Sequence, residues 1–203
     1  PKVELPKFSK GGLPYLDFEQ IQIFIPLIHG KTCELAALLA LHSLRLSELV
    51  DLKRKDIVIS KDGRATINVS GARVLDSNNR LVEKDTNKTY ASKREVPVVI
   101  PRLLEIIPDI DADEYIVQLS PQAIGKQINK ICKTNNLPLV SVHGLRRSFA
   151  SLGYHLGWPE LRTMSFGGWT NIETVHAHYL HESQKDIDQH SEKMKDFYKN
   201  IQV

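Results

Sequence analysis

The stretch of residues 142–181 constrains the fold and chemistry of this chain more than any other segment. A helix is expected at its start, and the pair Gly167-Gly168 breaks the chain before a tryptophan. The stretch holds adjacent arginines, several histidines and tyrosines, whereas its only carboxylates are those of Glu160 and Glu173. Guanidinium and imidazole groups stabilise the charged oxygens of a phosphodiester, and a tyrosine beside them can be the nucleophile. The stretch therefore favours phosphate chemistry over acyl transfer.

Two further basic motifs lie upstream of this stretch. Residues 43–52 read Ser-Leu-Arg-Leu-Ser-Glu-Leu-Val-Asp-Leu and contain Arg45 and Glu48. Residues 88–97 read Lys-Thr-Tyr-Ala-Ser-Lys-Arg-Glu-Val-Pro and begin with Lys88. Each motif alone is weak: Arg45 could be a surface cation favoured at a helix end, and Lys88 a solvated loop lysine.

The four motifs taken in order resemble those of the tyrosine recombinases, the phage and prophage integrase family. The third motif is His143-Gly-Leu-Arg146, and the fourth is Gly-Trp169 followed by Tyr179-Leu-His181. The resemblance runs from about residue 16 to Tyr179 and departs in one place. The spacing from Trp169 to Tyr179 is one residue longer than the family's.

The resemblance implies a mainly helical α+β domain with a small three-stranded antiparallel sheet. It implies DNA strand cleavage and rejoining, in which Tyr179 attacks the scissile phosphate and forms a 3′-phosphotyrosyl link. Glu48 is expected to support the Arg and His side chains rather than to react. The catalytic residues implied by the resemblance are Arg45, Lys88, His143, Arg146, Trp169 and Tyr179.

Each of these residues has a role in the expected reaction. Arg45, Arg146 and Trp169 are expected to hold the non-bridging phosphate oxygens, Lys88 to protonate the leaving 5′-oxygen, and His143 to assist proton transfer at the tyrosine. From the residues alone, His143 could instead be a core or capping histidine, and Trp169 could be a core side chain. Neither a metal ion nor a cofactor is expected.

The resemblance also implies partners and a location. The expected partners are double-stranded DNA at specific recombination sites, further copies of the chain in a tetramer on DNA, and accessory DNA-bending proteins. No membrane is expected, and the location would be the bacterial cytoplasm or nucleoid, from a phage or prophage gene. A net charge of +3 at pH 7 is compatible with DNA binding but does not indicate it alone.

The composition of the chain and the residue pattern at its two ends predict one main domain. A chain of 203 residues, 41% hydrophobic, fits one sizeable core. We expect residues 1–15 to be a linker from a missing N-terminal DNA-binding region, residues 16–181 the catalytic domain, and residues 182–203 a C-terminal tail helix with an apolar stripe. Cys33 and Cys132 lie in apolar helical patterns and are expected to be buried thiols.

Local signals predict the elements of that domain. The first helix should start at the capping residue Asp17 and end or kink at Pro26, Thr32 should cap the next, and Ser47 a short third helix. Further helices are expected at 102–107, at 122–134, from 142 and from 160. Strands are expected at 56–60, 65–69 and 94–99, with a polar excursion at 71–85.

Three rival functions remain open on sequence alone. A catalytically impaired DNA-binding module and a type IB topoisomerase-like relaxing enzyme would both retain most of the motifs. A histidine-metal hydrolase would use His176, His178 and His181, whose spacing can bring imidazoles near one ion. The histidine cluster is interpreted as a coincidental one that flanks Tyr179.

Overall fold

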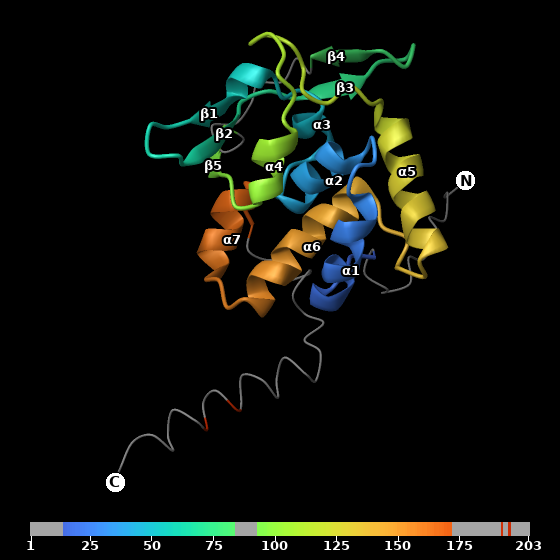
Figure 1. Cartoon of the computed structure of the whole chain (residues 1–203), viewed down its shortest axis with the longest axis vertical. Coiled ribbons are helices and arrows are strands. Elements are labelled where there is room, and N and C mark those ends of the chain that lie inside the picture. Colours follow the sequence, from blue (N-terminus) through green and yellow to red (C-terminus); the bar gives the residue numbers. More distant parts are fainter. Residues whose placement is uncertain (1–13, 84–92, 172–191, 193–194, 196–203) are drawn as a thin grey trace, which may run out of the picture.

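The computed structural model describes residues 14–83, 93–171, 192 and 195. Within them, helices make up most of the fold and a small antiparallel sheet lies at one edge, as the expected α+β fold requires (Figure 1). The helices are α1 (Phe18–Ile28), α2 (Glu34–Leu41), α3 (Leu46–Leu49), the 3-10 turn η1 (Arg54–Asp56), α4 (Pro101–Ile106), α5 (Pro121–Thr134), α6 (Val142–His155) and α7 (Glu160–Gly167). The strands are β1 (Ile57–Ile59), β2 (Ala65–Val69), β3 (Arg73–Leu75), β4 (Leu81–Glu83) and β5 (Arg94–Pro97).

Helix α1 begins at the predicted capping box and runs further than predicted. The side chain of Asp17 accepts a hydrogen bond from the Gln20 amide, and the Gln20 side chain accepts one from the Asp17 amide. Of the two predicted effects of Pro26, ending the helix is wrong, because α1 continues to Ile28 with the proline inside it. The side chain of Ile28 is fully buried, and this burial offsets the backbone hydrogen bond that proline cannot donate.

Helix α2 forms the centre of the core, and α3 follows it directly (Figure 1). All its residues except Leu35 are buried, which fits its almost entirely apolar sequence. Two capping predictions are wrong here. The N-cap of α2 is Cys33, while the hydroxyl of Thr32 donates to the Gln127 side chain. Helix α3 already starts at Leu46, so Ser47 lies inside it and not at its N-cap.

The predicted three-stranded sheet is present in the order β1-β2-β5. Ile57 of β1 pairs with Ile67 of β2, which pairs with Val96 of β5, so three buried side chains line the face that joins the core. The polar excursion contains a second, two-stranded sheet, β3-β4, that the sequence analysis did not predict. Asn79 in its turn has φ 59°, a left-handed conformation that asparagine tolerates.

Helices α5, α6 and α7 start at the predicted positions or within one residue of them. Ser120 caps α5 by accepting from the Ala123 amide, and Ser141 caps α6 by accepting from the Gly144 amide. Helix α6 packs against both α1 and α2, and α7 packs against α6 and β5 (Figure 1). Residue Gly168 has φ 60° and ends α7 in the left-handed conformation that favours glycine.

Several predictions fall on parts of the chain outside the described residues. These are residues 1–13 of the linker predicted at 1–15, the lysine-bearing segment at 84–92, and the segment that holds Tyr179; of the tail, only Glu192 and Lys195 are described. The two cysteines are buried free thiols, as predicted. Among the described helices, none is long and apolar enough to cross a membrane.

Gly144 allows the chain before α1 to pack on α6, so a methyl group there should destabilise the fold. A Cβ at this position would lie 2.6 Å from the Pro14 carbonyl oxygen. We expect Gly144→Ala to lower the free energy of unfolding by about 1–3 kcal/mol in urea denaturation. Gly125→Ala is the control, because no atom lies within 4 Å of its Cβ position inside α5. That variant should gain about 0.5–1 kcal/mol, and equal effects at both sites would contradict this packing argument.

Candidate active site

Arg45 lies where the chain passes from α2 into α3, and two bonds hold its guanidinium. One nitrogen donates to Oε1 of Glu48 at 2.6 Å and the other to the carbonyl of Gly168 at 2.9 Å. The Arg45 amide also donates to Oε2 of Glu48, which closes the first turn of α3. The side chain remains 40% exposed. Arg45 is therefore fixed at its guanidinium yet open to solvent.

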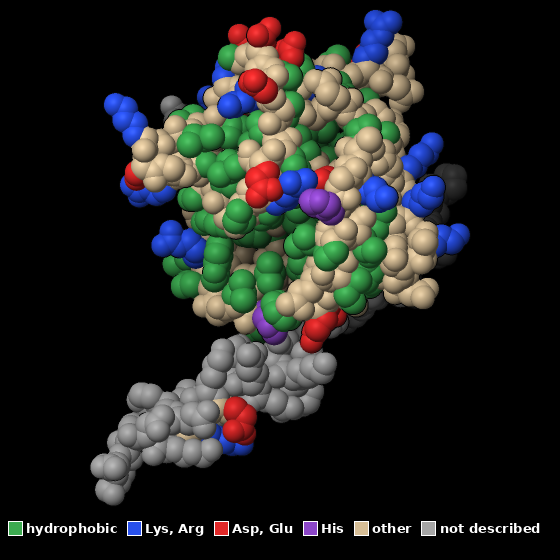
Figure 2. Space-filling view, viewed as in Figure 1, with side chains coloured by type: hydrophobic (Ala, Val, Ile, Leu, Met, Phe, Trp, Pro, Cys, Tyr) green, Lys and Arg blue, Asp and Glu red, His purple; other side chains and the backbone are tan. Residues whose placement is uncertain are grey.

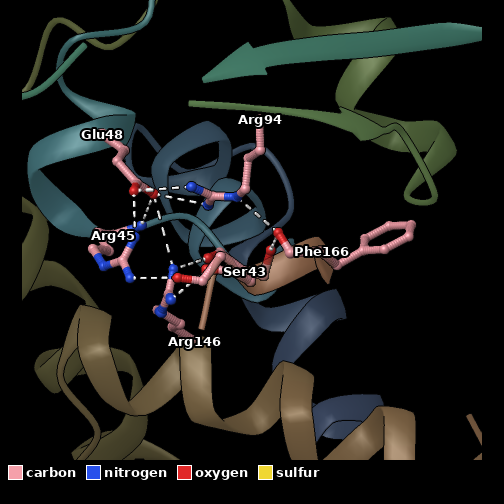
Figure 3. A network of polar contacts seen from close by, with 8 residues as sticks. Ser43, Arg45, Glu48, Arg94, Arg146 and Phe166 are labelled. Atoms are coloured by element: carbon pink, nitrogen blue, oxygen red, sulfur yellow. Dashed lines mark hydrogen bonds and ion pairs between the residues drawn. The ribbon is translucent and has the colours of Figure 1, made fainter. Parts of the chain in front are cut away.

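Arg146 comes from α6, a hundred residues later in the chain, and is buried in the same place. Its two terminal nitrogens donate to the carbonyls of Ser43 and Gly167, and one lies 3.9 Å from Oε2 of Glu48 (Figure 3). Its guanidinium carbon lies 4.4 Å from the centre of the Trp169 ring. The residue is only 1% exposed, so the protein covers this guanidinium almost completely.

Arg94, the first residue of β5, supplies a third guanidinium that the sequence analysis did not single out. Its two terminal nitrogens donate to the two oxygens of Glu48, each at 3.0 Å, and its Nε donates to the carbonyl of Phe166 at 2.9 Å (Figure 3). The paired geometry is the strongest form of an Arg–carboxylate contact. The only signal in the sequence was its place in the motif after Lys88.

The C-terminal end of α7 joins the three arginines. The carbonyls of Phe166, Gly167 and Gly168 accept from Arg94, Arg146 and Arg45, respectively. A helix C-terminus carries partial negative charge and unpaired carbonyls, so it stabilises nearby cations. One short segment of chain therefore orients three guanidinium groups that come from three other elements.

The electrostatics of the cluster favour an anion. Three guanidiniums face one carboxylate, so the cluster carries a net formal charge of +2. Burial raises the pKa of Glu48, but the hydrogen bonds and charge of Arg94, and then Arg45, lower it to about 2. Burial, and then the charge of Arg45, lower the pKa of Arg146 to about 9, so this guanidinium still keeps its charge at neutral pH.

Trp169 stacks on Arg146, and His143 lies three residues before Arg146 on α6. His143 is exposed in the first turn of α6, and desolvation, followed by the charges of Arg147 and Arg146, lowers its pKa and favours the neutral imidazole. The Trp169 ring occupies the space that a Cβ on Gly167 would need, because such an atom would lie 1.9 Å from the ring. Gly167 is thus required for the tryptophan to stack on the arginine.

Four of the predicted site residues therefore meet in one cluster, and His143 lies on the same helix. Arg45, Glu48, Arg146 and Trp169 are in contact through the bonds described above. Lys88 and Tyr179 lie outside the described residues, so their roles stay predictions. In the described part of the chain, no group of three or more His, Cys, Asp or Glu side chains is placed to hold a metal ion.

Comparison with known proteins agrees with this fold. The sequence model of the phage integrase family matches residues 15–186, and the chain therefore belongs to the phage integrase family. Membership makes it a tyrosine-type site-specific DNA recombinase, which confirms the predicted class of enzyme. A search of curated proteins found no match.

Solved structures of recombinases share the fold. The integrase of transposon Tn1549, in complex with circular intermediate DNA, matches with a TM-score of 0.70 and 19% identity, over 94% of this chain and 69% of that one. The XerA recombinase matches with a TM-score of 0.65 and 18% identity, over 94% and 67%. The catalytic domain of bacteriophage HP1 integrase matches with a TM-score of 0.55 and 17% identity, over 89% of this chain and 94% of that one. These likenesses confirm the predicted fold class.

Ser43 holds a strained backbone conformation whose carbonyl binds Arg146. Its φ is 79°, and its buried hydroxyl donates to the carbonyl of Phe166 at 3.1 Å. Ser43→Ala keeps the strain and loses this bond, which should cost about 1 kcal/mol in urea denaturation. Ser43→Gly loses the bond but removes a left-handed strain of about 1–2 kcal/mol. We expect the glycine variant to be the more stable of the two. The reverse order would show that the backbone at Ser43 is not strained.

Proposed function

We propose that this chain cleaves and rejoins DNA at specific recombination sites through a 3′-phosphotyrosyl intermediate, without a metal ion or ATP. The observation that carries the proposal is the cluster of three guanidiniums around one buried carboxylate, in a member of the phage integrase family. Its excess positive charge suits a phosphodiester, whose charge shifts onto the non-bridging oxygens during displacement. Because the ester energy stays in the protein–DNA link, rejoining requires no external energy source.

Arg45, Arg146 and Trp169 bind the non-bridging oxygens in this proposal. Arg45 meets the phosphate first, since its side chain is 40% exposed whereas Arg146 is 1% exposed beneath the Trp169 ring. A movement of that ring uncovers the Arg146 guanidinium and turns the indole N–H, a donor, toward the same phosphate. The tryptophan is thus both a cover for the arginine and a ligand for the substrate.

Tyr179 and Lys88 carry out the bond exchange. The Tyr179 oxygen attacks phosphorus, the bond to the 5′-oxygen breaks, and Lys88 gives that oxygen its proton. His143 accepts the tyrosine proton, for which a neutral imidazole is required, and the lowered pKa of His143 supports this assignment. A carboxylate with a pKa of about 2 is a poor proton acceptor, so Glu48 orients the arginines and does not react.

The partners in this proposal are double-stranded DNA at recombination sites, further copies of the chain in a tetramer, and accessory DNA-bending proteins. Exposed lysines on α5, where Figure 2 shows basic side chains gathered, are available for phosphate contacts. Residues 16–181 form the catalytic domain and residues 182–203 a tail helix that contributes to assembly. Residues 1–15 link this domain to an N-terminal DNA-binding region, as the 68% coverage of the transposon integrase chain allows.

Replacing the nucleophile should abolish the covalent intermediate. With a nicked suicide DNA site in EDTA, the wild-type protein should form a covalent adduct on a denaturing gel, because the nick lets the 5′-hydroxyl fragment diffuse away. Tyr179→Phe should form none, since it lacks the attacking oxygen. An adduct that persists in this variant and maps to Tyr154 or Tyr198 would assign the nucleophile elsewhere.

The role of Lys88 as the acid can be tested by changing the leaving atom. Lys88→Ala should slow cleavage of normal DNA by about 100-fold or more, because an unprotonated 5′-oxygen leaves poorly. A 5′-bridging phosphorothiolate should largely restore the rate, because sulfur leaves without a proton. If the sulfur substrate is cleaved as slowly as normal DNA, Lys88 is not the acid. His143→Ala is the control, and the sulfur substrate should not restore its rate.

A further inference from the structure

Arg94 has every edge of its guanidinium directed at the protein. Both terminal nitrogens bond to Glu48 and Nε bonds to the Phe166 carbonyl, and the side chain is 8% exposed. A Cβ on Gly168 would lie 3.0 Å from one of its terminal nitrogens, so the group lies against the end of α7. A side chain held in this way is built to fix its neighbours and not to bind substrate.

Glu48 connects the fixed guanidinium of Arg94 to that of Arg45. The two carboxylate oxygens that receive Arg94 also receive the Arg45 amide at 2.8 Å and its guanidinium at 2.6 Å. With Arg94 present, the plane of the carboxylate is set by two parallel bonds. Without Arg94, the carboxylate could turn onto Arg45 and Arg146, which lies 3.9 Å away, and the guanidiniums would turn with it.

The carbonyls at the end of α7 connect Arg94 to Arg146 as well. Arg94 binds the carbonyl of Phe166, and the next two carbonyls, of Gly167 and Gly168, bind Arg146 and Arg45. Since consecutive carbonyls move together, a shift of the first displaces the acceptors of both other arginines. Arg94 thus reaches Arg45 through both Glu48 and the end of α7, and it reaches Arg146 through the end of α7.

We propose that Arg94 is the positioning residue of the phosphate-binding site: it sets the orientation of Arg45 through Glu48 and of both Arg45 and Arg146 through the end of α7. This inference rests on the proposed function. Its physical basis is that removing one partner leaves a buried carboxylate short of donors, so that Glu48 turns the remaining arginines away from the orientation that the transition state requires. Arg94 acts on the rate of cleavage and not on the affinity for DNA.

The experiment measures single-turnover adduct formation by the whole chain on the nicked suicide site. Arg94→Met should lower the rate constant at saturating DNA by about 100-fold, while the DNA concentration for half-saturation changes by less than about threefold. Arg94→Lys should recover only part of the rate, because an ammonium cannot replace the planar fork. Arg102→Met is the control: Arg102 also bonds both oxygens of a buried carboxylate, that of Glu34, through Nε and one terminal nitrogen, and it plays no part in the site.

Two further measurements separate positioning from a loss of structure. On a methylphosphonate site, where a methyl group replaces one charged oxygen, the ratio of wild-type to Arg94→Met rates should shrink by about tenfold or more, because less charge needs to be stabilised. Adding Glu48→Gln to Arg94→Met should cost less than the product of the two single effects, since part of the Arg94 effect passes through the Glu48 carboxylate. The double variant also removes the unpaired charge, so it remains informative if Arg94→Met does not fold.

The outcomes separate this inference from the function on which it rests. If the wild-type chain forms no Tyr179-dependent adduct, the proposed function fails. If it forms the adduct and Arg94→Met cleaves as fast as Arg102→Met, the positioning role is overturned. The same holds if the loss at Arg94 is unchanged on the methylphosphonate, or if the Arg94 and Glu48 effects simply multiply.

Discussion

Three guanidiniums share one buried carboxylate, that of Glu48, and this contact determines how the elements of the site are arranged. A buried carboxylate is tolerated only when donors surround it, and an unpaired one costs about 3–5 kcal/mol. Glu48 is 5% exposed and accepts from Arg45 and Arg94. The requirement holds α3, β5 and the end of α7 at fixed distances from one another. The elements that carry the phosphate-binding groups are therefore positioned by the need to satisfy a group that does not react.

The same cluster is more positive than a stable core requires. One carboxylate cannot neutralise three cations, and the carbonyls at the end of α7 supply only partial charges. Arg146 shows the consequence, because burial and the nearby charge of Arg45 lower its pKa to about 9. A bound phosphate would supply the missing negative charge. The excess positive charge thus lowers the local stability of the free protein and strengthens its attraction for a phosphodiester. Sites that are preorganised for a charged transition state generally have this property.

The sequence predicted the reactive groups better than it predicted what holds them. Motif order identified Arg45 and Arg146, a hundred residues apart, as one site, and the structure brings them together with Glu48. That success depended on family resemblance, since helical periodicity alone left Arg45 as a surface cation. Arg94 was missed because its bonds reach residues distant in sequence, on α3 and α7. Ser43 was missed because a left-handed φ in a buried serine is imposed by tertiary contacts, and no local pattern indicates it.

Arginine is suited to this site because one guanidinium can be held by the protein and still bind substrate. It has five N–H donors in a rigid plane, whereas lysine has three on a freely rotating group. Arg45 uses one N–H for Glu48 and one for the Gly168 carbonyl, and the exposed remainder of the fork can face a phosphate. An ammonium bound to the same two acceptors would have one donor left and no fixed direction for it. The fixed acceptors at Glu48 and at the end of α7 therefore turn a flexible side chain into an oriented phosphate ligand, and they do so before any DNA is bound.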